Sequence, residues 1–327
     1  MGVVSMCKSA VYSLLTATCS LLWLAKQADA SYGDRSYVFQ RCIYSCVQHN
    51  CTSSQALSQF TTAQPWHQWA LRWTCEDECG YICMWTTVDA FQKDGIGIPH
   101  FYGKWPFIRL FGMQEPASVL FSILNGLFHL RILTYRRLVP SSVPMYHVWQ
   151  CVAVISMHTW FWSTVFHARD TPLTEMMDYF SAFSLVLSNL FCLCCRVLGT
   201  DRPLRPALCG VVLLGLFIQH TYYLSMIKFD YGYNMKVNVT VGSVNLVGWM
   251  IWCCYHKQRY VWKCATVVVG LNVFLALELG EFSPVFWVFD AHSLWHASTF
   301  PLCYLWYSFL IDDGVYLSNL QTKDKIW

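Results

Sequence analysis

The chain has 327 residues, of which 55% are hydrophobic and 13% are charged, and its formal net charge is +3. A soluble domain has about a quarter of its residues charged, so this composition predicts an integral membrane protein. The charge is small and dispersed, and the sequence has no Gly-rich phosphate loop or mixed aromatic and basic motif. We therefore expect no nucleic-acid partner.

Residues 1–30 are expected to be a signal peptide that is removed from the mature protein. Lys8 gives a weakly positive start, and the stretch from Ala10 to Ala25 is apolar. Ala28-Asp29-Ala30 then has the small-x-small pattern of a cleavage site. A retained signal anchor is the alternative, because the apolar run is long. In both cases the following segment is delivered to the lumen.

Residues 31–106 are expected to form a small lumenal domain. An even number of cysteines in an oxidising compartment predicts three disulfide bonds, here among Cys42, Cys46, Cys51, Cys75, Cys79 and Cys83. Cys42 and Cys46 are four residues apart, as are Cys79 and Cys83, so each pair would line one face of a helix. An antiparallel hairpin of these helices would join Cys42 to Cys83, Cys46 to Cys79, and Cys51 to Cys75. A zinc cluster is the alternative, although the compartment disfavours free thiolates.

The sequence contains two glycosylation sequons. Asn50-Cys51-Thr52 lies in the lumenal segment, so Asn50 is a predicted glycosylation site. Asn238-Val239-Thr240 lies at a predicted membrane boundary, and we expect it to be unused.

Residues 107–311 contain seven apolar stretches that are long enough to cross a hydrocarbon core, which takes about 20 helical residues. The predicted fold is therefore all-α, a seven-transmembrane helix bundle that follows a disulfide-rich lumenal domain. The predicted spans are Glu115–Leu133, Met145–Phe166, Met176–Leu198, Ala207–Ile227, Val237–Tyr255, Val261–Leu279 and Val285–Ile311.

The charges between the spans predict their direction. Short basic loops stay in the cytosol, and basic residues gather in the first, third and fifth connections: Arg131, Arg136, Arg137, Arg196, Arg202, Arg205, Lys257, Arg259 and Lys263. The other connections are mixed or acidic and are assigned to the lumen. An odd number of spans after a lumenal start leaves the tail, residues 312–327, in the cytosol.

The tail carries a candidate retrieval signal. Lys323 and Lys325 stand five and three places from the C-terminus. This is the spacing of a dilysine signal, which coat retrieval machinery reads on the cytosolic side and which says nothing about chemistry. The sequence therefore predicts a multi-pass protein of the endoplasmic reticulum and Golgi membranes.

Five polar residues lie near the predicted lumenal ends of three spans: Ser163, His167, Asp178, His292 and His296. Ser163 and His167 are four residues apart, as are His292 and His296, so each pair would share one face of a helix. Ionisable groups in membrane helices are costly and indicate a functional site. Two histidines four residues apart often have only a packing role in a bundle core. All five residues are predicted to lie in the same leaflet, however, which favours a single site.

The expected chemistry of this site is metal-dependent hydrolysis. Three neutral imidazoles about 2.0–2.1 Å from the ion form a zinc site with one open position, so His167, His292 and His296 are the candidate ligands. Zinc lowers the pKa of a bound water to about 7 and polarises a carbonyl group. Asp178 is the candidate general base, and Ser163 is either an oxyanion donor or a partner that orients His167.

Two further carboxylates are alternatives to Asp178. They are Asp170 and Asp290, which lie close to the candidate ligands in the sequence. Asp290 could instead orient a neighbouring histidine. A role of Ser163 as a covalent nucleophile is not expected, because no separate His–Asp pair remains to activate it.

Longer strings around these residues resemble a known family. The pattern Ser-x3-His-x10-Asp followed by His-x3-His is similar to that of the alkaline-ceramidase superfamily of seven-span metal hydrolases. With the lumenal cysteines and the dilysine tail, the flanking strings resemble the post-GPI-attachment to proteins factor 3 family over essentially the whole mature chain. The most specific strings are Tyr102-Gly103-Lys104-Trp105-Pro106-Phe107, Phe161-Trp162-Ser163-Thr164-Val165-Phe166-His167 and Phe229-Asp230-Tyr231-Gly232-Tyr233-Asn234. Tyr102 stands where some relatives have a histidine and is not a candidate ligand.

This resemblance implies an enzyme of GPI-anchor fatty-acid remodelling. Its reaction would be hydrolysis of the sn-2 acyl ester in the phosphatidylinositol moiety of GPI-anchored proteins, which gives a lyso intermediate. Its substrates would be GPI-anchored proteins, held in the lipid of the lumenal leaflet. The residues alone do not distinguish an ester from an amide, so a ceramidase-like amidase stays open as an alternative. The other alternative is a non-catalytic seven-span receptor in which the metal site has only a structural role.

Overall fold

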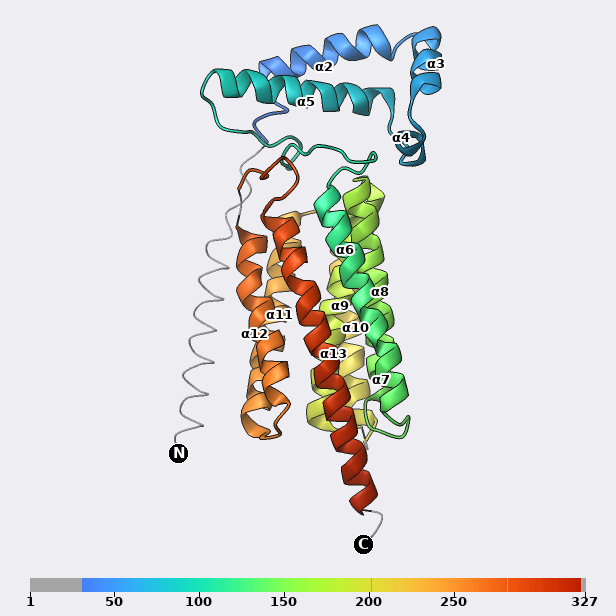
Figure 1. Cartoon of the computed structure of the whole chain (residues 1–327), viewed down its shortest axis with the longest axis vertical. Helices are drawn as coiled ribbons and strands as arrows, with labels where there is room; N and C mark the ends of the chain where they lie inside the picture. The colour runs from blue at the N-terminus through green and yellow to red at the C-terminus, as the bar shows by residue number, and fades with distance from the viewer. Residues whose placement is uncertain (1–30, 201, 281, 325–327) are drawn as a thin grey trace.

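The computed structural model describes residues 31–200, 202–280 and 282–324. These residues form two helical parts, a group of N-terminal helices that lies across one end of an elongated helix bundle, and the bundle itself (Figure 1). The predicted signal peptide and Lys325 lie outside the described residues.

The N-terminal part is a helical hairpin with two shorter helices at its turn. The elements are α2 (Tyr37–Asn50), α3 (Ser54–Ala63), α4 (Trp66–Ala70) and α5 (Cys75–Lys93). The side chains of Ser36 and Ser53 cap the starts of α2 and α3, and Thr74 and Asp77 form a reciprocal capping box at the start of α5. Helices α2 and α5 lie side by side (Figure 1).

Disulfide bonds join α2 and its C-terminal cap residue to α5. They are Cys42–Cys83, Cys46–Cys79 and Cys51–Cys75. This is the connectivity that the antiparallel hairpin predicts, and it leaves none of these six sulfurs for a zinc cluster. The apolar clusters of this part are small. Each cross-link stabilises a fold by typically about 2–4 kcal/mol, so the bonds replace the large core that the hairpin lacks.

The bundle follows the N-terminal part in the chain and consists of helices. The described residues contain no β-sheet. Its helices are α6 (Pro116–Phe128), α7 (Ile132–Leu138), α8 (Tyr146–Ala168), α9 (Pro172–Leu198), α10 (Leu204–Tyr222), α11 (Tyr231–Tyr255), α12 (Val261–Leu279) and α13 (Ala291–Asp324). A 3₁₀ turn, His129–Arg131, joins α6 to α7, and a π-helical turn, Tyr223–Ile227, extends α10. Pro116 and Pro172 begin α6 and α9, where a missing N–H costs nothing.

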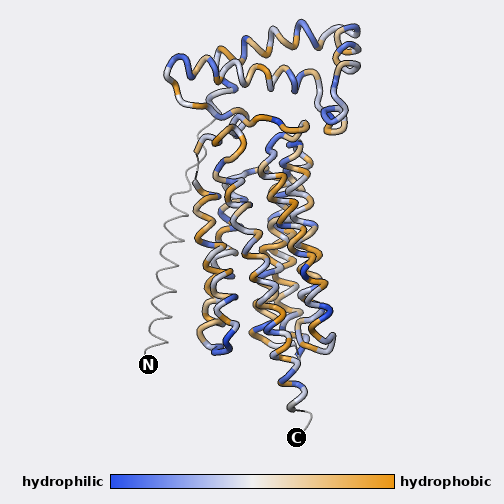
Figure 2. The backbone as a smooth tube through the Cα atoms, in the orientation of Figure 1, coloured by the Kyte–Doolittle hydropathy of each residue, from blue (hydrophilic) through white to orange (hydrophobic). Residues whose placement is uncertain are grey.

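Five helical segments are long and apolar enough to cross a membrane: Pro116–Leu138, Pro172–Leu198, Leu204–Ile227, Tyr231–Tyr255 and Val261–Leu279. Hydrophobic residues dominate the bundle, and hydrophilic residues gather in the N-terminal helices and at the turns of the opposite end (Figure 2). The chain is therefore an all-helical, multi-pass membrane protein. Helices α8 and α13, which correspond to the second and seventh predicted spans, lie in the same bundle but are not among these five segments.

The helix at the seventh predicted span, Val285–Ile311, begins later than predicted and extends beyond the predicted end. Val285 and Phe289 form a tight turn joined by a β-bridge, and α13 begins only at Ala291. Asp290 and Ser293 explain this start, because each side chain bonds the other's backbone N–H. At the other end α13 continues to Asp324, so most of the predicted tail is helical.

The main apolar core of the bundle is built around aromatic side chains. Trp306 packs edge-on against Trp149 of α8 and Trp249 of α11. Beside them α9 and α11 approach closely, because Gly248 has no side chain, and a Cβ there would overlap Leu193 Cδ2. Any side chain at this position would have to displace Leu193 from the contact between α9 and α11.

Replacement of Gly248 by leucine is expected to overpack this contact and to destabilise the protein by about 1–3 kcal/mol. The matched control is Gly242→Leu in the same helix, where an added Cβ meets no atom within 4 Å. Thermal unfolding in detergent should show a lower midpoint for the first variant only. Equal midpoints for the two variants would contradict this packing.

Candidate metal centre

The three predicted histidines meet at the end of the bundle that faces the N-terminal helices. His167 lies in the last turn of α8, and His292 and His296 lie in the first two turns of α13. His292 Nε2 is 3.2 Å from His167 Nε2 and 2.9 Å from His296 Nε2. Among the described residues, the ligand nitrogens of these three lie within 4.8 Å of one another and could hold a metal ion.

Two carboxylates fix the orientation of two of these rings. Glu115, the residue before α6, places Oε2 2.7 Å from His167 Nδ1. Glu278, near the end of α12, places Oε2 2.5 Å from His292 Nδ1. A carboxylate accepts a hydrogen bond, so each Nδ1 donates to its carboxylate, and the Nε2 atoms of the two rings face one another.

This arrangement fits a cation. Ring nitrogens about 3 Å apart need a proton or a metal ion between them, and the helices hold these three rings in place. Neutral imidazoles with their second nitrogen bonded to a carboxylate are the usual donors for zinc and similar ions. The donor set of His167, His292 and His296 is therefore that of an open three-histidine site.

A serine pair supports the third histidine. Ser122 Oγ of α6 lies 3.3 Å from His296 Nδ1 and 3.0 Å from Ser163 Oγ, and all three side chains are buried. Trp160 packs edge-on against the same imidazole. Ser163 therefore connects to His296 through Ser122. The side chain bonded to His167 Nδ1 is that of Glu115, and the hydroxyl of Ser163 bonds Ser122 instead.

A lysine balances the carboxylate behind His167. Lys104 Nζ lies 2.5 Å from Glu115 Oε1 and 2.9 Å from Asp170 Oδ2. Burial alone would lower the pKa of the Lys104 ammonium, but the two carboxylates raise that pKa well above its usual value. Lys104 is therefore charged and leaves the second oxygen of Glu115 available for His167.

Asp178 lies beside the cluster without belonging to it. It is in the second turn of α9, and its carboxylate lies close enough to His167, His292 and Lys104 to interact with them electrostatically. No side chain among the described residues donates a hydrogen bond to this carboxylate. Asp178 is not one of the mutually close ligand groups. This placement suits a general base better than a fourth ligand.

The alternative carboxylates have other partners. Asp170 pairs with Lys104, and Asp290 caps α13 through Ser293, so Asp290 does not orient a histidine ring. The sequence analysis missed Glu115, Glu278 and Ser122 as supporting residues. Their only signal is a polar side chain at the edge of, or inside, an apolar stretch.

Comparisons with known proteins place the chain in a family. The model of the Per1-like family matches residues 65–314, which is most of the chain and includes all three histidines. The chain belongs to the Per1-like family. This confirms the resemblance that the sequence strings indicate.

Relatives of this Per1-like chain are similar over nearly their whole lengths. Proteins called GPI-specific phospholipase A2-like PGAP3 from Danio rerio and Homo sapiens are each 46% identical to it. The alignments cover 91% and 92% of this chain, and 95% and 94% of the relatives. Post-GPI attachment to proteins factor 3 from Drosophila melanogaster is 42% identical over 85% of this chain and 87% of its own length. No solved structure shows a significant match.

Replacement of Glu115 by glutamine should weaken metal binding by the three histidines roughly 10- to 100-fold, because His167 loses a charged partner. Glu175→Gln is the matched control, since Glu175 bonds the Tyr179 hydroxyl and no histidine. Metal retained after dialysis against chelators of graded strength, measured by mass spectrometry, gives the affinity. Identical retention in both variants would argue against a supporting role of Glu115.

Proposed function

We propose that the chain is a GPI-specific hydrolase that removes the sn-2 acyl chain from the phosphatidylinositol moiety of GPI-anchored proteins. The observation that carries this proposal is the three-histidine cluster with its carboxylate partners, in a chain similar over nearly its full length to proteins named GPI-specific phospholipase A2-like. The lyso-GPI product would then be reacylated by a separate activity.

The proposed membrane arrangement has seven spans. Helices α8 and α13 would complete the bundle together with the five apolar segments. The N-terminal disulfide-bonded part would be lumenal, because disulfides form in oxidising compartments, and Asn50, which is exposed, would be glycosylated there. The histidine cluster would then lie at the lumenal leaflet. Lys323 and Lys325 would direct retrieval between Golgi and endoplasmic reticulum.

In this proposal His167, His292 and His296 would hold a zinc ion. Such an ion supplies an activated water and a polarised ester carbonyl. The Asp178 carboxylate would accept the proton of the attacking water, because it lies beside the cluster and has no hydrogen-bond donor among the described side chains. Glu115 and Glu278 keep the imidazoles in the ligating tautomer, and Ser163 acts with Ser122 on His296.

The direct test is expression in cells that lack GPI fatty-acid remodelling. Mass spectrometry of a purified GPI-anchored protein should show saturated sn-2 chains restored by the wild-type protein and not by His167→Ala, His292→Ala or His296→Ala. A correctly localised protein that fails to restore these chains would contradict the proposed substrate. Full restoration by all three variants would contradict the metal mechanism. Release of fatty acid from ceramide instead would favour the amidase alternative.

Replacement of Asp178 by asparagine should lower kcat for the ester roughly 10²- to 10⁴-fold, the usual contribution of a general base. The bound metal should stay at the wild-type level, because Asp178 is not one of the grouped ligands. Hydrolysis rate and metal content are measured on the same purified sample. Loss of metal in step with activity would mean that Asp178 acts as a ligand.

A further inference from the structure

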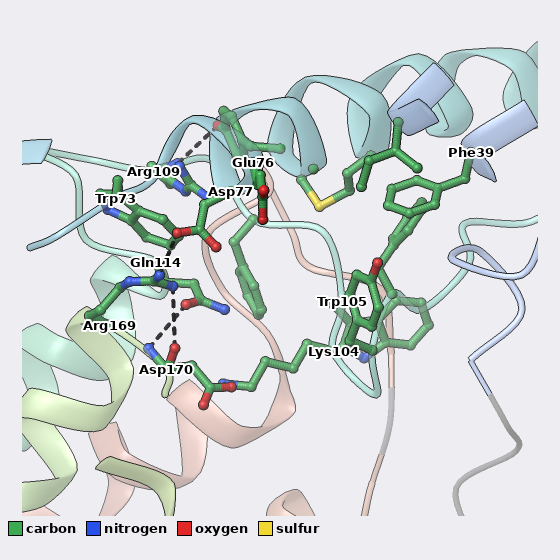
Figure 3. Close-up of a pocket in the computed structure, with 17 residues that line it drawn as sticks. Phe39, Trp73, Glu76, Asp77, Lys104, Trp105, Arg109, Gln114, Arg169 and Asp170 are labelled. Carbon is green, nitrogen blue, oxygen red and sulfur yellow. Dashed lines mark hydrogen bonds and ion pairs between the residues drawn. The ribbon is translucent and has the colours of Figure 1, made fainter. Parts of the chain in front are cut away.

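A second site lies between the N-terminal helices and the bundle, outside the histidine cluster. It is a cavity of about 330 Å³, lined by α2, α5, the segment before α6 and the loop after α8. Pockets for small organic ligands begin at roughly 300 Å³, so this cavity can hold a small part of a head group. Trp73, Arg109 and Arg169 form one wall, and Phe39 and Trp105 form the other (Figure 3).

The positive charges in this cavity are already neutralised. Each of its three cationic side chains has a carboxylate partner within 3 Å among the described residues: Lys104 with Glu115 and Asp170, Arg109 with Glu78, and Arg169 with Asp77. Phosphate recognition needs guanidinium or ammonium groups that are free to pair with the anion. The cavity is therefore poorly suited to a phosphate group.

One carboxylate in the cavity has no partner. Glu76, in the first turn of α5, makes no ion pair or hydrogen bond with another described side chain, and it projects into the space between the two walls (Figure 3). A hydroxyl group can donate to this carboxylate and accept from the paired Arg109 and Arg169. The apolar face of a sugar ring can pack on an aromatic ring such as Trp105.

We infer that this cavity binds a carbohydrate, the glycan part of the substrate head group. The inference rests on the proposed function, in which the substrate is a GPI lipid. It adds a specificity site, which would distinguish that lipid from phospholipids without a glycan.

The position of the cavity beside the histidines supports this inference. Lys104 lines the cavity, its ammonium contacts Glu115 Oε1, and Glu115 Oε2 accepts the hydrogen bond from His167 Nδ1. Gln114 also lines the cavity, and its side chain accepts a hydrogen bond from Asp170 N. A single side chain therefore separates the cavity from the carboxylate that orients His167. A bound glycan would hold its attached lipid next to the histidine cluster.

The chain offers a substitution that fills this cavity without disturbing the helix. Gly80 of α5 lines the cavity, and an added Cβ meets no atom within 4 Å. Gly80→Leu would therefore occupy the ligand space and also favour the helix. Gly97→Leu is the matched control, because Gly97 is equally open, exposed and outside the lining. Glu76→Gln, a change of nearly equal size on the α5 surface, is a second variant that preserves the fold.

Binding is measured with the full chain in detergent, and the probe is the lipid-free glycan of a GPI-anchored protein. Gly80→Leu and Glu76→Gln should each weaken glycan binding roughly tenfold or more, the effect of losing at least one good polar contact, and Gly97→Leu should not. Inorganic phosphate should not displace the glycan. Equal affinities of Gly80→Leu and Gly97→Leu, or displacement by phosphate, would overturn the inference.

A second measurement separates this inference from the proposed function. Hydrolysis of a GPI lipid and of phosphatidylinositol without a glycan is compared for each variant. Gly80→Leu should lower the preference for the GPI lipid roughly tenfold, mainly through KM. If both lipids are cleaved and the preference is unchanged, the cavity inference fails and the proposed hydrolase stands. If no variant cleaves either lipid but the glycan binding difference remains, the proposed function fails and the cavity inference stands.

Discussion

Three imidazoles lie side by side, two of them buried, and each of their ring nitrogens needs a partner. The rest of the site depends on this constraint. Glu115 and Glu278 accept hydrogen bonds from the Nδ1 atoms of His167 and His292, so the Nε2 atoms of these rings converge. Burying a carboxylate is itself costly unless it is paired, and Lys104 pairs with Glu115. The site is thus a connected set of charges held by the ends of α6, α8, α12 and α13.

The segment before α6 connects the N-terminal helices to the bundle through ion pairs with both parts. Arg109 from this segment reaches Glu78 of α5, and Lys104 from the same segment reaches Glu115 at the start of α6. Arg169, just after α8, pairs with Asp77 of α5. These contacts, together with the disulfides between α2 and α5, fix the cavity wall against the histidine cluster. The proposed carbohydrate site and the proposed hydrolytic site would therefore act on one ligand.

Local spacing in the sequence predicted much of this structure. Helical periodicity places His292 and His296 on one face, and the same rule, applied to an antiparallel hairpin, predicts the pairing of Cys42 with Cys83. The start of α13 was misplaced, because Val285–Phe289 is apolar like a span and only the Asp290 cap marks the boundary. Glu278 was missed because its partner lies across a turn on another helix. Such contacts depend on tertiary packing, which spacing within one helix does not encode.

The most direct test of the account is hydrolysis by the purified protein before and after removal of its metal. Fatty acid released from the sn-2 position of a GPI lipid is measured by mass spectrometry on the native, chelated and metal-restored samples. The account predicts that chelation abolishes release, that about one equivalent of zinc per chain restores it, and that His292→Ala does not recover with zinc. Full release by the metal-free protein would contradict the central claim that the three histidines hold a catalytic ion.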